Sequence, residues 1–403
     1  MTQLANRADV SASAPTNSGA AATRASGPFC GLIDAVLVQE PVIENFPGSV
    51  NAEAAQAIWV WVTRDLCNDI FAPEKLSSGT LMAADVEAAM PEILGRMKAG
   101  LAQGQADAEG ARRLSAQLGR EDARHHLPTV MLALRNRALL GKAQAFGKAT
   151  NTISDETALG TAMQAMPLQD PALAALVFQA AMGQVAQPTK LILAAIKVSG
   201  AATEVSVRRS GLGPLIDACV SHAQNQLRYF QAIGPFADVD LICRALERFH
   251  RLVRALTGYL EFSRGSQATA VLSAITKHVS DRIEPRLKEV VTDLNQAMRR
   301  RETTDRLDTD KLLAAVGGIY LLATVRDCRD SLALNTVYEQ AWHQSGQALE
   351  IHIQRNMDLF KENPDDANTI ARLDAVIQMA QVRFSPEYAD TLKRARQAAE
   401  RRN

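Results

Sequence analysis

Apolar residues recur every three or four positions from residue 29 to the end of the chain. This spacing is typical of helices that bury one face, whereas a half-buried strand alternates every second residue. Alanine is abundant and clusters of Val, Ile and Thr are nearly absent, which also favours helix over strand. Residues 50–71 show the pattern clearly, with Ser49 or Asn51 as the expected N-cap and apolar positions at Ala55, Ile58, Val62, Leu66 and Ile70. The sequence therefore predicts an all-α protein.

One break in the helical pattern divides the chain. Residues 199–214, with the sequence SGAATEVSVRRSGLGP, replace the apolar periodicity with Gly, Ser, Pro and paired Arg. We therefore expect a helical domain over 29–200, a linker over 201–213 and a second helical domain over 214–403. The first is Ala-rich with many Gly and Pro breaks, and the second is a bundle of long helices or a degenerate helical array. Its expected helices are 236–262, 265–300, 310–329, 331–361, 366–382 and 386–402.

The first 28 residues differ from the rest of the chain. They consist mainly of Ala, Ser, Thr, Asn and Gly, so they bury too little apolar surface to offset the entropy of ordering, and we expect a disordered tail over 1–28. They lack the apolar core of a secretory signal peptide. The tail is also poor in acids and carries Arg7 and Arg24, which leaves open its use as an export or organelle-targeting signal.

Charge and hydropathy narrow the classes of function. The 403 residues include 44 Lys and Arg against 44 Asp and Glu, which gives a formal net charge of zero. A chain without net charge has no overall attraction to nucleic acid or anionic lipid. Its basic clusters also lack interleaved aromatic residues on which bases could stack. Nucleic acid is therefore not an expected partner. The most apolar stretch, 312–323, is too short to cross a bilayer and is interpreted as a buried core helix, so no membrane span is predicted.

The cysteines indicate the redox environment. Cys30, Cys67, Cys219, Cys243 and Cys328 lie tens of residues apart and form no Cys-x-x-Cys pair. An odd, scattered set is typical of reduced, buried thiols, because a disulfide framework needs pairs at short spacing. This predicts a cytoplasmic protein.

Two short motifs have the spacing of metal ligands. Residues 121–126 (EDARHH) place two acids four positions before two histidines, and Glu247 and His250 have the Glu-x-x-His spacing of di-iron bundles. Adjacent histidines diverge by about 100° on a helix, and a second Glu-x-x-His does not occur. His250 also lies off the apolar face of its helix. We therefore predict neither a metal site nor a cofactor.

Two features point to a protein partner. Arg244, Arg248 and Arg251 fall on one face of a predicted helix, opposite its apolar face, and forked guanidiniums match carboxylates bidentately. The simpler interpretation is a solvated outer face. Trp61 lies well off the apolar face of its own helix, so either that helix is buried all round or Trp61 is an interface anchor.

An unusual polar row lies in the apolar stripe of residues 331–361. Ser345, His352 and Asn356 occupy positions that should be buried, so each must find a hydrogen-bond partner across the bundle. We expect the segment 326–330, with Arg326 and Asp330, to supply those partners. The row is then either a structural network that fixes helix register or the polar lining of a small-ligand site.

No motif of an enzyme class is present: the sequence has no phosphate-binding Walker loop, no Gly-x-Ser-x-Gly elbow and no His-Glu-x-x-His. The first hypothesis is therefore a helical scaffold, adaptor or regulatory protein that binds an acidic protein partner or self-assembles. The second is a helical enzyme or ligand-binding protein that uses the polar row around His352. The third is an exported protein directed by its tail.

Overall fold

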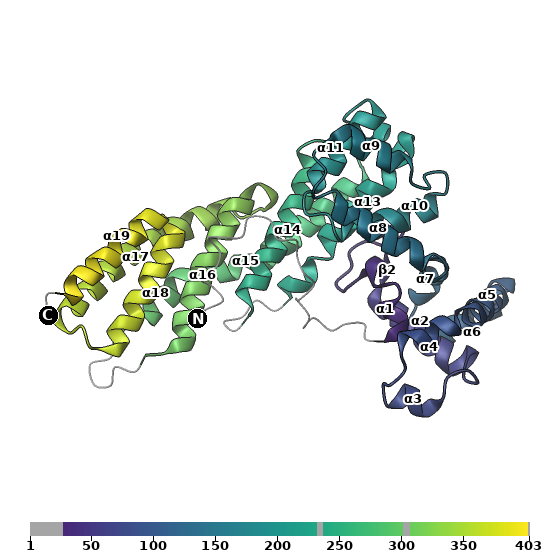
Figure 1. The fold of residues 1–403 in the computed structure, drawn as a ribbon, viewed down its shortest axis with the longest axis horizontal. Helices are drawn as coiled ribbons and strands as arrows, with labels where there is room; N and C mark the ends of the chain where they lie inside the picture. The colour runs from purple at the N-terminus through teal and green to yellow at the C-terminus, as the bar shows by residue number, and fades with distance from the viewer. Residues whose placement is uncertain (1–26, 232–236, 301–306, 402–403) are drawn as a thin grey trace. The chain divides into compact units, whose positions relative to one another are not determined.

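The computed structural model describes residues 27–231, 237–300 and 307–401, and their fold is helical throughout (Figure 1). The all-α prediction is confirmed. In these residues, strand structure is limited to β1 (Leu37–Val38) and β2 (Val50–Asn51), which pair in parallel. All but the last two residues of the predicted tail lie outside the described residues.

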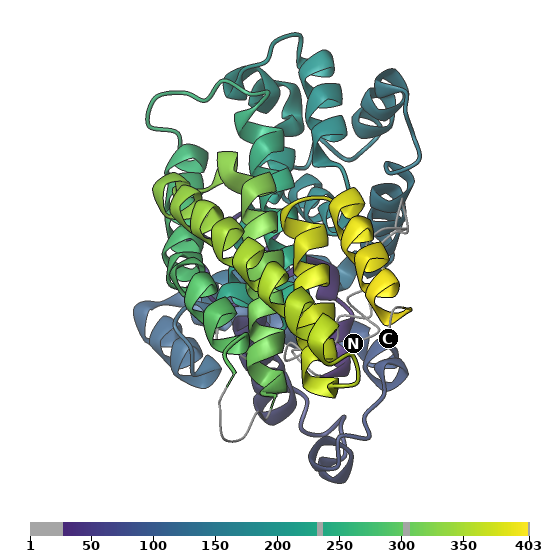
Figure 2. The same cartoon turned by 90° about the vertical axis from the view of Figure 1, so that its left-hand side faces the viewer.

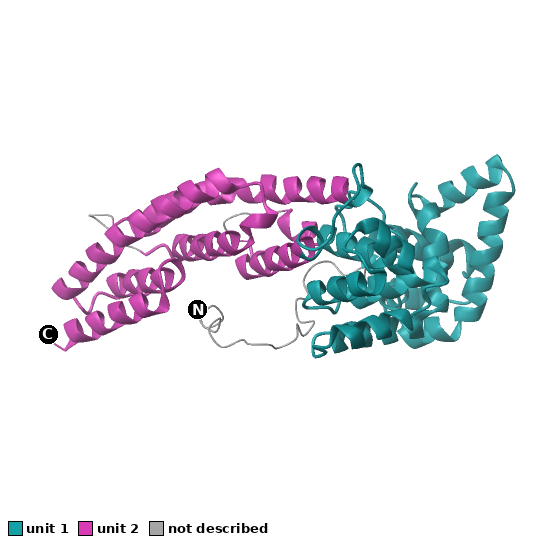
Figure 3. Cartoon of the chain, turned by 90° about the horizontal axis from the view of Figure 1, so that it is seen from above, with its two compact units in different colours: residues 1–225, 255–268 teal, residues 226–254, 269–403 magenta. Residues whose placement is uncertain are grey.

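The chain forms two compact units, coloured separately in Figure 3. The first takes in residues up to 225 together with 255–268, and the second takes in 226–254 together with 269–403. The division therefore falls after the expected linker 201–213. Residues 204–212 of that segment are helical. Hydrogen bonds join the start of the segment to the loop after α14 (Val239–Thr257): the amide of Glu204 donates to the carbonyl of Glu261 at 2.9 Å, and the amide of Glu261 donates to the carbonyl of Ala202 at 2.8 Å.

The first unit contains mostly short helices. They are α1 (Pro28–Gly31), η2 (Asp34–Val36), α2 (Ala52–Trp61), η3 (Val62–Leu66), α3 (Pro73–Ser77), α4 (Ala83–Ala88), α5 (Met90–Ala106), α6 (Ala108–Leu118), α7 (Ala123–Arg135), α8 (Arg137–Ala149), α9 (Glu156–Gln164), α10 (Pro171–Met182), α11 (Pro188–Ser199), α12 (Glu204–Val207), η4 (Arg208–Leu212) and α13 (Gly213–Gln224). Their starts follow from capping chemistry. Asn51 accepts from the amides of Glu53 and Ala54, and Asp170, ahead of Pro171, caps α10 in the same way.

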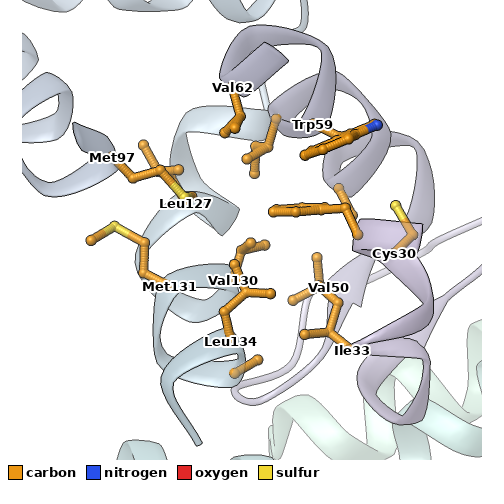
Figure 4. Close-up of a cluster of buried hydrophobic side chains, with 14 of the residues drawn as sticks. Cys30, Ile33, Val50, Trp59, Val62, Met97, Leu127, Val130, Met131 and Leu134 are labelled. Atoms are coloured by element: carbon orange, nitrogen blue, oxygen red, sulfur yellow. The ribbon is translucent and has the colours of Figure 1, made fainter. Parts of the chain in front are cut away.

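Aromatic stacking organises the core around α1, α2 and α7 (Figure 4). The rings of Phe29 and Trp59 stack with centroids 4.9 Å apart, and Phe71 meets Trp59 edge-on at 5.5 Å. A second layer is built on α10, which is buried on almost every side and packs against α8 and α13. Gly147 of α8 permits the close approach of α8 to α10, because a Cβ there would lie 2.1 Å from the carbonyl oxygen of Ala181.

The second unit contains the long helices. They are η5 (Leu227–Phe230), most of α14, α15 (Gln267–Ala297), α16 (Thr309–Cys328), η6 (Arg329–Ser331), α17 (Asn335–Glu362), α18 (Ala367–Arg383) and α19 (Pro386–Glu400). Helix α16 is its centre: every residue from 314 to 325 is buried, as the apolar run in the sequence predicted. Helices α17 and α18 both pack on α16, and α18 also contacts α19, as Figure 2 shows in light green and yellow.

Candidate interaction surface on the second unit

The predicted arginine row, Arg244, Arg248 and Arg251, lies on α14 opposite a fully buried face. Leu246 and Phe249 on that face have no exposed surface. The Arg244 side chain is 69% exposed and pairs with Asp240 one turn earlier on the same helix. Arg251 is exposed and Arg248 is half-buried. The row is thus an outer face of an amphipathic helix that presents guanidiniums to solvent.

The end of α16 lies beside this row. The Nδ1 atom of His250 is 2.9 Å from the hydroxyl oxygen of Ser331, and the thiol of Cys328 contacts the carbonyl oxygen of Leu246 at 3.9 Å. Burial raises the pKa of Cys328 to about 12, and the guanidinium of Arg251 acts against that shift. His250 is thus engaged in packing α14 against η6. Among the described residues, no group of three or more His, Cys, Asp or Glu could hold a metal ion.

The predicted polar row is buried, but its partners differ from those expected. Ser345 donates to the carbonyl of Trp342 at 3.1 Å within α17. The Nε2 atom of His352 is 2.8 Å from the Oδ1 atom of Asn295 on α15, and the side-chain amide of Asn356 donates to the carbonyl of His352 at 2.8 Å. Asn295, which lies 57 positions before His352 in the chain, therefore takes the role expected of Arg326 and Asp330.

Arg326 and Asp330 do not meet the polar row because both are exposed at the end of α16 and in η6. Arg326 pairs with its neighbour Asp327 at 2.9 Å. The hydrogen bond of His352 links α17 to α15, and that of Asn356 stays within α17.

Buried imidazoles should make the stability depend on pH. Burial is the main reason why the pKa is lowered for four imidazoles, those of His126, His250, His278 and His352. A folded-state pKa below the unfolded value of ~6.5 means that the unfolded chain binds more protons as the pH falls. We expect the free energy of unfolding, measured by urea titration, to decrease as the pH is lowered from 7 through ~6.5. The decrease should be smaller for His352→Gln, and a stability independent of pH between about 5 and 7 would contradict the burial of these rings.

A cluster of arginine and aromatic side chains lies where the end of α16, the start of α17 and the end of α18 meet. We call Arg326, Tyr338, Trp342 and Arg383 the Trp342 cluster. The guanidinium carbon of Arg383 lies 3.7 Å from the centroid of the Trp342 ring, and that of Arg326 lies 5.1 Å from it. The rings of Tyr338 and Trp342, one turn apart, have centroids separated by 5.8 Å. Both arginines are thus within the range of cation–π attraction to one indole.

Positive charge is concentrated around this indole. Burial is the main reason why the pKa of Arg383 is lowered, and the nearby positive charge of Arg326 lowers it further. Burial also raises the pKa of Tyr338, and the guanidiniums of Arg326, Arg329 and Arg383 oppose that shift. The geometry places two of these guanidiniums, those of Arg326 and Arg383, over the ring of Trp342.

The sequence did not predict the Trp342 cluster. Tyr338 and Trp342 are four residues apart, which indicates that they share a helix face. Arg383 lies 41 positions after Trp342, and no local sequence pattern indicates that the two residues are in contact. Only the packing of α18 on α17 brings them together.

Trp61, the other candidate anchor, belongs to the core of the first unit. Its side chain is only 1% exposed, and its ring packs so closely on α5 that a Cβ at Gly100 would lie 2.8 Å from it. The helix is therefore buried around this position, and the interpretation of Trp61 as a surface anchor is corrected. The ring is enclosed by its own unit and offers no area to a partner.

Comparisons with known proteins give no match: no family model, no curated protein and no solved structure corresponds to this chain. No helix in the described ranges combines the length and the apolarity needed to cross a membrane. The five cysteines are free and buried. A function for the chain must therefore be inferred from its own residues and their geometry.

Proposed function

We propose that this chain is a helical scaffold, adaptor or regulatory protein that binds an acidic segment of a protein partner through the arginine row of α14. The observation that carries the proposal is the position of Arg244 and Arg251, both exposed on a helix whose opposite face is fully buried. Guanidiniums on a rigid helix are held at fixed spacing, so they can pair with several carboxylates at once. The five buried thiols support a cytoplasmic location within this proposal.

The charge of the arginine row, rather than the net charge of the chain, would attract the partner. The net charge of the chain is zero, so long-range attraction to any acidic molecule is weak and specificity must come from the row itself. Self-assembly is the other form of this proposal, in which carboxylates of a second copy pair with the row. Self-assembly would then be salt-sensitive in the same way as binding to another protein.

Reversing the charges of the row tests the proposal. We expect R244E/R248E/R251E to lose the protein captured by the wild-type chain from its own cell extract, because each substitution places a carboxylate against the acidic partner. Raising the salt concentration should release the same protein from the wild type. The melting temperature should change little, since two of the three side chains are exposed.

A matched control separates the row from charge in general. K98E/R112E/R113E makes the same change in net charge at exposed positions of α5 and α6 and should retain the partner. Light scattering on both variants shows whether the partner is a second copy, because only the row variant should then become monomeric. Capture of the same protein by the row variant and the control, at equal strength, would refute the proposal.

A further inference from the structure

The guanidinium of Arg383 is half-buried and forms no ion pair in the described part of the chain. Its Nη2 atom donates to the carbonyl oxygen of Trp342 at 2.7 Å, and its Nε atom is buried with no acceptor. Among the described residues no carboxylate forms an ion pair with it; the acid that acts on it, Glu350, does so only at longer range. Partial burial of a guanidinium without a carboxylate is unfavourable, and an anion bound to its exposed part would offset that cost.

The packing of α17 and α18 keeps the guanidinium in this position. Gly346 lies one turn after Trp342, and a Cβ at Gly346 would come within 2.6 Å of the Nη2 atom of Arg383. The absence of a side chain there leaves room for the guanidinium over the indole, with its carbon 3.7 Å from the ring centroid. The position of the guanidinium over the ring is therefore set before any ligand arrives, which reduces the entropy lost on binding.

The neighbouring charges favour an anion at the same place. Arg326 lies over the same ring, and its side chain is 42% exposed, so a ligand can reach it from solvent. Its ion pair with Asp327, which is 64% exposed, is a weak one that a better-placed carboxylate could replace. The guanidinium carbons of Arg383 and Arg326 lie 3.7 and 5.1 Å from the centroid of the same ring, so their like charges repel each other, and a bound anion would reduce that repulsion.

We propose that the Trp342 cluster is a binding site for a carboxylate side chain of an acidic peptide, contacted by the guanidiniums of Arg383 and Arg326 at the edge of the indole. The inference rests on the proposed function, because the peptide belongs to the same acidic partner. The helix that carries the arginine row packs against the end of the helix that carries Arg326: the thiol of Cys328 on α16 lies 3.9 Å from the carbonyl oxygen of Leu246 on α14. A peptide with several acids, rather than a single small anion, matches guanidiniums spread over α14, α16 and α18.

Binding of fluorescein-labelled octaglutamate, followed by fluorescence anisotropy, tests the site. We expect R383Q to weaken the affinity about tenfold or more, because a charge-assisted hydrogen bond is lost. R326Q should weaken it less, since that side chain is more exposed. R394Q is the control: it removes the same charge from an exposed position on α19, where Arg394 bonds only within its own helix, and should bind as the wild type does.

Tryptophan fluorescence provides a second measurement, on the wild-type chain. Trp59 and Trp61 are 7% and 1% exposed, whereas Trp342 is half-buried at the surface. Octaglutamate should therefore change the emission of Trp342, and W342F should abolish that change while keeping the signal of the other two. If R383Q fails to fold, G346A replaces it, because the added methyl displaces the guanidinium and should also weaken binding.

The outcomes separate this inference from the proposed function. The carboxylate site would be refuted if folded R383Q binds octaglutamate as tightly as the wild type and the peptide does not change the emission of Trp342 in the wild type. This holds even if R244E/R248E/R251E loses its partner. Weakened octaglutamate binding in R383Q, together with full partner capture by the row variant, would support the carboxylate site and refute the role of the row. Loss in both variants, with R394Q and K98E/R112E/R113E intact, supports both.

Discussion

Replacing Arg286 by alanine is expected to lower the free energy of unfolding of the second unit by about 3 to 5 kcal/mol. The Arg286 side chain is only 5% exposed and binds three groups: Nη1 bonds Glu289 at 3.1 Å and also Asp293, and Nη2 donates to the carbonyl oxygen of Ala314 at 3.2 Å. The last bond joins α15 to the central helix α16. Removing the guanidinium leaves Asp293, which is 24% exposed, and the Ala314 carbonyl without this partner, which is why the loss should be large.

Arg282 provides the control for this substitution, because it lies one turn earlier on α15 and is exposed. R282A should change the free energy of unfolding by no more than about 0.5 kcal/mol. The measurement is urea unfolding followed by circular dichroism, and R286K should fall between the two because a lysine keeps the charge but cannot make the forked contacts. Equal stability of R286A and R282A would mean that Arg286 does not link α15 to α16.

The fold class could be predicted because it depends on local patterns. The 3–4 spacing of apolar residues gave helices close to α14, α15, α17, α18 and α19, and the continuous apolar run 312–323 became the buried α16. The N-cap Asn51, one of the two candidates expected from the sequence, could be predicted because a cap and the amides from which it accepts are two or three residues apart. These interactions are short-range, so one sequence is enough to identify them.

The site depended on contacts that no local pattern encodes. The polar row could be predicted from the apolar spacing of its own helix. Its partner Asn295 lies on α15, and apolar spacing does not indicate which other helix packs against the row. The same holds for Arg383, whose stacking on Trp342 depends on the packing of α18 against α17 near Gly346. The sequence predicted a linker at 201–213, but residues 204–212 are helical, and no local pattern indicates the hydrogen bonds that tie Glu261 to this segment.

Gly147→Ala and Gly141→Ala should shift stability in opposite directions although both replace a glycine of α8. At Gly147 the new methyl would lie 2.1 Å from the carbonyl oxygen of Ala181, a rigid part of α10, and 3.1 Å from the Cβ of Gln184. Helices α8 and α10 must then separate, and we expect the free energy of unfolding to fall by about 3 kcal/mol. Gly141 is exposed and has no atom within 4 Å of such a methyl, so the same change should stabilise by up to ~1 kcal/mol through helix propensity alone.

The two variants together measure the energetic cost of crowding the contact between α8 and α10. Both variants gain the same helix propensity, so the stability of Gly141→Ala minus that of Gly147→Ala isolates the cost of the contact with α10. Urea titrations of the two variants and the wild type, followed by circular dichroism, give this difference directly. If Gly147→Ala were as stable as Gly141→Ala, α8 and α10 could not be in contact at Ala181, and the packing of the first unit around α10 would have to be rebuilt. If the difference reaches about 4 kcal/mol, the close approach of these two helices is a principal determinant of that core.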